Sequence, residues 1–178
     1  MGPETASQFP RISFGRLPEE PPDVVRELLN ESRNWRHLPL AATFSTAATA
    51  DWVRAKDDQW NQNGYGPWAI RIDDEFAGWG GFQREGDLAD FGLVLHPRFW
   101  GMGAEITRLA LVRGFTDLGL TAVTIALPFS RNVDRTLGRL GFRPDGEVTH
   151  GASSVRRFRL TRPDWQRAWP TGPGPATE

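Results

Sequence analysis

Cysteine is absent from this chain of 178 residues. Disulfides, a cysteine nucleophile and a zinc ribbon are therefore excluded. Histidine is scarce as well: His37, His96 and His150 lie far apart without the spacing of a metal site, so no bound metal is expected. No apolar run approaches the roughly 20 residues that span a bilayer, and the N-terminus lacks a basic segment followed by an apolar core. We therefore expect a cytoplasmic protein without a membrane anchor.

An excess of charge of one sign is also missing, because 21 basic residues face 22 acidic ones and the net charge is -1. Nothing in the overall field attracts nucleic acid or an anionic membrane, so neither is expected as a partner. The length suits one domain, predicted for residues 9–169. Residues 1–8 are expected to be flexible, and residues 170–178, rich in Gly and Pro, to be disordered.

A glycine turn is the most informative feature. Residues 98–104, Arg-Phe-Trp-Gly-Met-Gly-Ala, follow the apolar run 91–95 and open an amphipathic stretch. Gly101 and Gly103 predict close approach of the backbone to a ligand, in dihedrals that a Cβ would forbid, with N–H groups aimed at a phosphate. The helix that starts there adds positive charge at its N-terminus. A dinucleotide fingerprint would need glycine at Ile106, and a Gly-Lys-Ser/Thr P-loop is absent.

The turn resembles motif A of the GNAT superfamily of acyl-CoA-dependent N-acetyltransferases, Gln/Arg-x-x-Gly-x-Gly/Ala. Residues 96–103, His-Pro-Arg-Phe-Trp-Gly-Met-Gly, are similar to the His-Pro-x-Tyr-Trp-Gly-Lys-Gly segment of the RimJ/RimL branch, which acetylates ribosomal-protein N-termini. Residues 137–142, Leu-Gly-Arg-Leu-Gly-Phe, resemble the end of motif B, and residues 67–70 and 76–82 resemble the two strands before motif A. Order and spacing agree over roughly residues 10–161.

The resemblance implies an α+β fold with α/β/α layers. Its mixed, mostly antiparallel sheet would have about seven strands, splayed between strands 4 and 5 and flanked by about four helices. Periodicity and turn signals place the elements. Strands are predicted at 9–17, 68–72, 76–83, 88–95, 122–127, 142–148 and 153–160, and helices at 21–32, 45–63, 101–118 and 131–140.

In this family the turn grips the pyrophosphate of coenzyme A, so acetyl-CoA is the implied cosubstrate. Arg98 could bind the pyrophosphate in bidentate fashion, and the strand backbone at Val94 and Leu95 would lie along the pantetheine and the thioester. The basic stripe of the short helix could meet the 3′-phosphate; a solvated face is the alternative. The predicted cofactor-binding residues are Val94, Leu95, Arg98, Trp100, Gly101, Met102, Gly103, Ala104, Ser130 and Arg135.

The catalytic candidates are Asp90, Ser130 and Tyr65. Asp90, where the related branch has Glu, could take the amine proton or hold an ammonium, and a solvated surface aspartate is the alternative. Leu137 stands where the family often has a tyrosine acid, and leucine cannot protonate a thiolate. Ser130, Tyr65 or water would have to replace it, although Ser130 could instead cap a helix.

The acceptor is left open between a peptide N-terminus and a small-molecule amine, because the segment from about residue 33 to 66 that would contact it is variable in the family. Four tryptophans of the region that frames the acceptor cleft in this family, Trp52, Trp60, Trp68 and Trp79, either wall the cleft or pack in the core. A degenerate acyl-CoA-binding sensor is the rival function. A homodimer is also left open.

Overall fold

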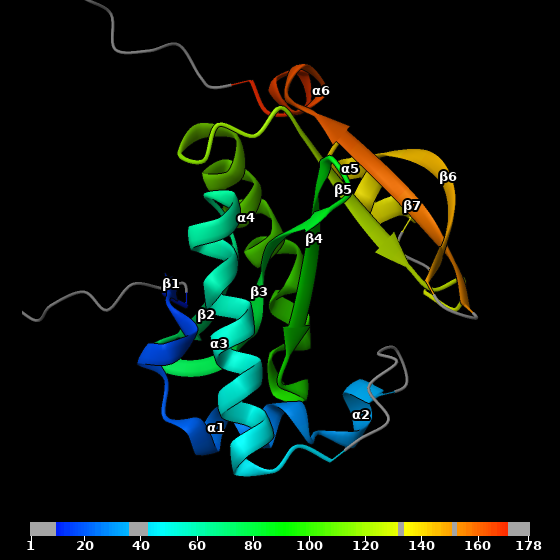
Figure 1. The fold of residues 1–178 in the computed structure, drawn as a ribbon. Coiled ribbons are helices and arrows are strands. Elements are labelled where there is room, and N and C mark those ends of the chain that lie inside the picture. Colours follow the sequence, from blue (N-terminus) through cyan, green and yellow to red (C-terminus); the bar gives the residue numbers. More distant parts are fainter. Residues whose placement is uncertain (1–9, 36–42, 132–133, 151–152, 171–178) are drawn as a thin grey trace, which may run out of the picture. The chain divides into compact units, whose positions relative to one another are not determined.

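The computed structural model describes residues 10–35, 43–131, 134–150 and 153–170. The segment predicted to be flexible at 1–8, nearly all of the predicted tail, and His37 lie outside this described part. The chain forms two compact units, drawn in Figure 1: unit 1 comprises Met1–Gly81 and Leu93–Ile106, and unit 2 comprises Phe82–Gly92 and Thr107–Glu178. Along the described chain, no helix is long and apolar enough to cross a membrane.

Seven strands form one sheet in the order β1-β2-β3-β4-β5-β7-β6. The pairs β1–β2, β2–β3, β5–β7 and β6–β7 are antiparallel. Two register pairs, Ala89↔Val123 and Asp90↔Thr124, join β4 to β5 in parallel. The predicted mixed, mostly antiparallel sheet is confirmed. The two register pairs that join β4 to β5 form a short pairing, which agrees with the predicted splay of these two strands. The strands are β1 (Ile12–Gly15), β2 (Pro67–Ile72), β3 (Glu75–Glu85), β4 (Leu88–Leu95), β5 (Ala122–Leu127), β6 (Arg143–His150) and β7 (Ser153–Thr161).

Six α-helices and two 3-10 helices accompany the sheet in the described part of the chain. Among the α-helices, α2 and α6 were not predicted. Ahead of α6, the hydroxyl of Thr161 accepts from the Asp164 N–H at 3.3 Å, which is an N-cap signal that the sequence carried. The helices are η1 (Leu17–Glu19), α1 (Pro22–Leu29), α2 (Ser32–Trp35), α3 (Thr46–Asn63), η2 (Pro97–Met102), α4 (Gly103–Thr116), α5 (Asp134–Arg139) and α6 (Arg162–Ala168).

Local signals explain the ends of α3 and the turn after β2. Ser45 caps α3 by accepting from the Ala48 N–H at 3.1 Å, and Gly64 ends it with a φ of 76°. Asp73 and Asp74 join β2 to β3 with φ of 50° and 67°, the left-handed pair that a two-residue hairpin turn needs. Both features match the sequence prediction.

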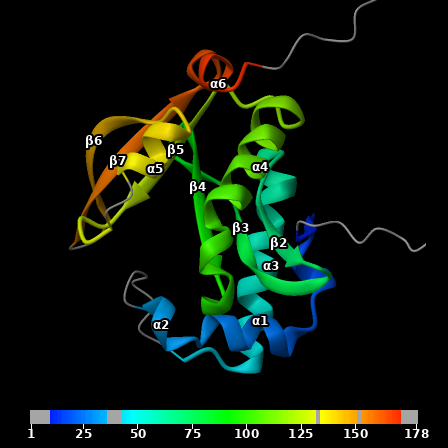
Figure 2. The same cartoon turned by 180° about the vertical axis from the view of Figure 1, so that it is seen from behind.

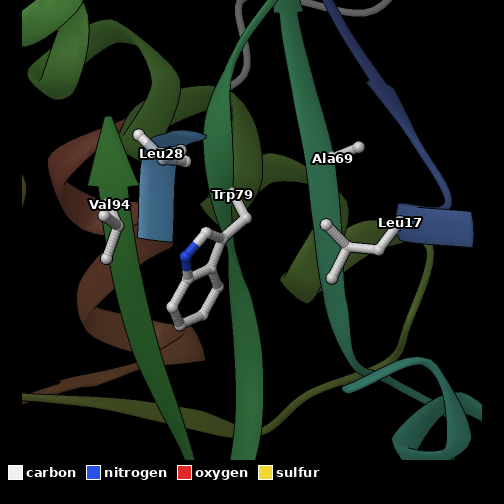
Figure 3. Close-up of a cluster of buried hydrophobic side chains, with 5 residues drawn as sticks. All are labelled: Leu17, Leu28, Ala69, Trp79 and Val94. Carbon is white, nitrogen blue, oxygen red and sulfur yellow. The ribbon is translucent and has the colours of Figure 1, made fainter. Parts of the chain in front are cut away.

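The core of unit 1 lies between α1, α3 and the strands. Figure 3 shows Leu17, Leu28, Ala69 and Val94 around the indole ring of Trp79, a cluster of buried side chains. Trp52, Val53 and Phe76 pack against it. Along α3, Ala47 and Ala50 are exposed, whereas Thr49 is fully buried. Thr49 tolerates burial because its hydroxyl donates to the Ser45 carbonyl at 2.8 Å.

Unit 2 packs helices against its own strands, and α5 lies against them in Figure 2. Phe115 of α4 stacks on Trp165 of α6 with ring centroids 5.1 Å apart. A Cβ at Gly114 would lie 2.6 Å from the ring of Phe82, so this glycine allows close packing of the helix. Buried residues of β5 include Thr124, whose hydroxyl donates to the Asp90 carboxylate.

Candidate functional site

The predicted glycine turn is a 3-10 helix, η2, that runs directly into α4. The Phe99 N–H donates to the His96 carbonyl at 2.8 Å, and the Gly103 N–H donates to the Trp100 carbonyl. Gly103 has a φ of -57° and a ψ of -40°, and Gly101 is not among the glycines with positive φ. The expectation of dihedrals forbidden to other residues is therefore wrong, because helical backbone continues through the turn.

The two glycines are nevertheless not required by packing. A Cβ at Gly101 would meet no atom within 4 Å, and one at Gly103 would find only Leu93 Cδ2, at 3.9 Å. Ala104, the next residue, is exposed. A run of small residues at the start of a 14-residue helix leaves open surface beside a partial positive charge.

Met102 takes a different position from its neighbours. Its half-buried side chain packs against the cluster of Ile70, Ile72, Ala77, Leu95 and Ile106. Phe99 packs there too. Met102 therefore anchors η2 to the core, and only its backbone remains available for the predicted contact with a ligand.

Arg98 forms an ion pair with Glu75, the first residue of β3. Its guanidinium also lies over the Phe99 ring, 4.8 Å from the centroid. Both partners of the ion pair are about half exposed, and such pairs contribute roughly 0–1 kcal/mol. The pairing orients Arg98 at the turn, and it is weak enough for a phosphate to compete with Glu75.

Val94 and Leu95 end β4, and both side chains are buried. They alternate as strand residues do, Val94 packing beside Trp79 and Leu95 in the second cluster with Ile106. The Leu95 carbonyl accepts from the indole N–H of Trp100 at 3.2 Å, while 52% of Trp100 is exposed. The same carbonyl accepts from the side-chain amide of Asn34. Sequence reasoning missed Asn34, because nothing in its neighbourhood signals this contact.

Asp90 belongs to unit 2 and is half-buried. Its carboxylate accepts from the Thr124 hydroxyl at 2.9 Å, directly across the β4–β5 register pair. This contact orients the carboxylate and makes it more than a solvated surface aspartate. A carboxylate held in this way can accept a proton or bind an ammonium.

The described part of the short helix, α5, runs from Asp134 to Arg139, and Ser130 lies in an exposed turn after β5. Arg135 is exposed, as are Arg131 and Arg139, so the basic stripe faces solvent. Leu137 is only 6% exposed and packs as an apolar residue.

Tyr65 is half-buried between α3 and β2, in unit 1. The tryptophans of the predicted acceptor region pack in pairs. Trp68 and Trp79 are buried. The ring centroids of Trp60 and Trp68 are 5.4 Å apart, and those of Trp52 and Trp79 are 5.1 Å apart. The packing alternative therefore holds for Trp68 and Trp79.

The structure groups the predicted site residues unequally. Within unit 1, those of the β4 end and the turn are neighbours along one continuous segment, whereas Asp90, Ser130 and Arg135 belong to unit 2. The predicted site residues that belong to unit 1 are Tyr65, Val94, Leu95, Arg98, Trp100, Gly101, Met102, Gly103 and Ala104.

Across the described residues, no group of three or more His, Asp or Glu side chains is arranged to hold a metal ion.

Known structures share this architecture. RimJ from Mycobacterium smegmatis, solved with CoA-disulfide, has a TM-score of 0.69 at 16% identity, over 86% of this chain and 82% of that one. The ribosomal-protein α-N-acetyltransferase RimL, solved with coenzyme A, has a TM-score of 0.70 at 17% identity, over 84% and 93%. The aminoglycoside acetyltransferase AAC(6')-Ib with coenzyme A has a TM-score of 0.68 at 18% identity, over 89% and 98%.

Sequence comparison identifies the family. No curated protein matches the chain. The Acetyltransferase (GNAT) domain, however, matches residues 11–143, which is more than half of the sequence and includes β4, η2 and α4. The sequence match and the fold agree with each other. The chain therefore belongs to the GNAT acetyltransferase family.

Proposed function

We propose that this protein transfers an acetyl group from acetyl-CoA to a primary amine, by direct attack of the amine within a complex of both substrates. The observation that carries the proposal is the open surface at Gly101 and Gly103, where packing does not require glycine. The family membership supplies the class of reaction. The similar structures named above were solved with coenzyme A or its disulfide, which supports the same cosubstrate.

The pyrophosphate would bind at the start of α4. Small residues there allow a phosphate to approach the backbone, and the helix N-terminus favours its charge. Arg98 would exchange Glu75 for a phosphate oxygen, since the exposed ion pair is weak and a guanidinium binds phosphate in bidentate fashion. The turn thus combines a helix terminus and a side-chain cation on one segment.

The chemical step requires a neutral amine, donors for the oxyanion and a proton for the leaving thiolate. The amine nitrogen attacks the thioester carbon, the carbon–sulfur bond breaks, and the amine loses a proton. The strand backbone at Val94 and Leu95 would lie along the thioester, where the Leu95 N–H would stabilise the oxyanion. Asp90, oriented by Thr124, would accept the amine proton, directly or through water.

Protonation of the leaving thiolate is the step at which this chain departs from its family pattern. Leu137 is buried and apolar, so it supplies no proton. The exposed Ser130, the half-buried Tyr65 and solvent are the remaining sources. A thiol with a pKa near 8.5 is a fair leaving group, so solvent could suffice.

The acceptor is the open part of the proposal. The similar structures act on different amines: RimL is named for ribosomal-protein N-termini and AAC(6')-Ib for aminoglycosides. A panel of peptides with free N-termini and small-molecule amines, incubated with acetyl-CoA and followed by thiol release, would separate these classes. Turnover with one class and acetylated product by mass spectrometry are the expected results.

A variant pair sharpens this assay. Asp90→Asn should lower turnover roughly 100-fold while coenzyme A affinity stays nearly constant, as the loss of a general base does. Asp87→Asn, in the exposed turn before β4, is the matched control and should leave the rate unchanged. Equal rates for Asp90→Asn and the parent from pH 6 to 9 would rule out the base.

A sensor that binds acyl-CoA without turnover is the second candidate, favoured by the burial of Leu137 at the family's usual acid position. Calorimetry separates the two functions. Tight binding of acetyl-CoA, with no thiol release from any amine of the panel, would replace the enzyme with the sensor.

A further inference from the structure

The Leu95 carbonyl accepts two side-chain hydrogen bonds. The Asn34 amide donates to it at 3.2 Å, and the Trp100 indole N–H donates to it at 3.2 Å. Asn34 belongs to α2 and Trp100 to η2, so two segments far apart in sequence converge on one backbone oxygen. Asn34 is only 8% exposed. The hydrogen bond to the Leu95 carbonyl satisfies this buried amide.

The N–H of the same peptide unit is also bonded. The His96 N–H donates to the Ala77 carbonyl of β3 at 2.8 Å. Three hydrogen bonds therefore hold the peptide plane between Leu95 and His96. Rotation of this plane would break bonds on both of its sides, so the direction of the last residues of β4 is fixed.

This direction matters for the neighbouring N–H. In an extended strand, the N–H and the C=O of one residue point to the same edge. The His96 N–H faces β3, so Leu95 presents its N–H and C=O to the opposite edge. An oxyanion bound by the Leu95 N–H would lie near the partial negative charge of the Leu95 oxygen. Donors from Asn34 and Trp100 reduce that repulsion.

Asn34 is itself held in place. Its backbone N–H donates to the Glu31 carbonyl at 3.0 Å, and the Arg33 side chain pairs with the Glu31 carboxylate at 2.8 Å. The hydrogen bond from the Arg33 side chain is the largest cause that lowers the pKa of Glu31, to about 2. The corner between α1 and α2 thus brings Asn34 to the end of β4 as an ordered element.

We propose that Asn34 and Trp100 are positioning residues for acetyl transfer, which hold the Leu95 carbonyl and thereby aim the Leu95 N–H at the thioester oxygen. This inference rests on the proposed function and extends it to two side chains that touch neither substrate through this contact. Trp100 then acts by holding the backbone of the strand, whereas the sequence predicted that it contacts the cofactor. Asn34 becomes part of the site for the first time.

Three variants and one control test the proposal, with an acceptor from the amine panel and acetyl-CoA as substrates. Trp100→Phe removes the N–H and keeps a ring, Asn34→Leu replaces the amide with an apolar group, and the third variant combines both. Asn30→Leu is the matched control, because the Asn30 side chain also bonds backbone, the Phe44 carbonyl and N–H at 3.0 and 2.8 Å, away from β4.

The expected result is a loss of about threefold to tenfold in kcat for Trp100→Phe, the size that one hydrogen bond allows. The KM for acetyl-CoA should stay within about twofold of the parent, and the double variant should lose more. Asn30→Leu should lower thermal stability without lowering kcat. Because Trp100 is largely exposed, Trp100→Phe should fold even where Asn34→Leu does not.

Unchanged kcat in Trp100→Phe and in the double variant would overturn the positioning role. A raised KM with constant kcat would also overturn it, since Trp100 would then contact the cofactor itself. An inactive parent protein would overturn the proposed function and this inference together. An active parent with unaffected variants would overturn this inference alone.

Discussion

Glycine serves two different purposes in β3 and in the turn before α4. A Cβ at Gly78 would lie 2.1 Å from the Val94 oxygen, and one at Gly81 would lie 2.7 Å from the Gly66 oxygen. At Gly101 and Gly103 a Cβ would meet no protein atom closer than 3.9 Å. Folding therefore explains Gly78 and Gly81 of β3 and does not explain Gly101 and Gly103 of the turn. The difference supports the proposal that the turn serves binding, whereas these two glycines of β3 serve stability.

The largest expected effect is on stability. Gly78→Ala places its Cβ against backbone that cannot move away, so we expect the free energy of unfolding to fall by about 3 kcal/mol or more. Chemical denaturation followed by tryptophan fluorescence measures it. Gly101→Ala is the matched substitution in the turn and should change stability by about 0.5 kcal/mol or less. Equal losses in the two variants would remove the distinction between the two regions.

Coenzyme A affinity, in contrast to stability, should respond to substitution in the turn. Gly103→Val fills the open surface at the start of α4, so coenzyme A affinity should fall about 100-fold, from a steric overlap of 1–3 kcal/mol added to a lost phosphate contact. Calorimetry with coenzyme A gives the affinity. Gly138→Val, at an open position of α5, serves as the control and should bind as the parent does. Normal affinity in a folded Gly103→Val protein would show that the ligand lies elsewhere.

The side chain of the turn should contribute less. Arg98→Ala should weaken acetyl-CoA binding by about 1.5 kcal/mol, the lower end for a hydrogen bond to a charged group, because Arg98 must first leave Glu75. Glu75→Gln should strengthen binding a few-fold, since it removes the competing carboxylate. Together the two titrations test whether phosphate and Glu75 compete for Arg98. An unchanged affinity in Arg98→Ala would contradict the phosphate assignment.

The smallest effect concerns Lys56 in the core region. Its Nζ lies over the rings of Trp79 and Trp52, 5.0 and 5.7 Å from their centroids, and burial lowers its pKa from 10.5. Between the lowered pKa and 10.5 the unfolded chain binds more protons than the folded one, so stability increases with pH in that window. The free energy of unfolding of the parent should therefore increase, relative to that of Lys56→Met, as the pH rises toward 10.5. A constant difference between the two proteins would contradict the shift.

The sequence predicted β4 and β5 at 88–95 and 122–127, because mostly apolar runs bounded by turns leave few alternatives. The caps Ser45 and Gly64 were also found from local chemistry. Their positions depend on a few neighbouring residues, which is why sequence alone sufficed.

What sequence reasoning missed depends on contacts between distant segments. Asn34 reaches Leu95 across 61 positions, and no local pattern announces such a bond. The dihedrals of Gly101 and Gly103 were predicted wrongly, because glycine is compatible with helical backbone as well as with left-handed turns. The proximity of Glu75 to Arg98 likewise follows from the β3–β4 pairing and from no motif.

The most direct test of the central claim is to follow backbone amide resonances while coenzyme A is added to the ¹⁵N-labelled protein. The resonances of Gly101, Gly103 and Ala104 should shift with saturation, because the proposed site would place the pyrophosphate against these amides. Those of Gly64 and Gly86, which occupy left-handed turns elsewhere, should stay in place. Saturable shifts centred on other residues, with the turn unmoved, would contradict a cofactor site at the start of α4.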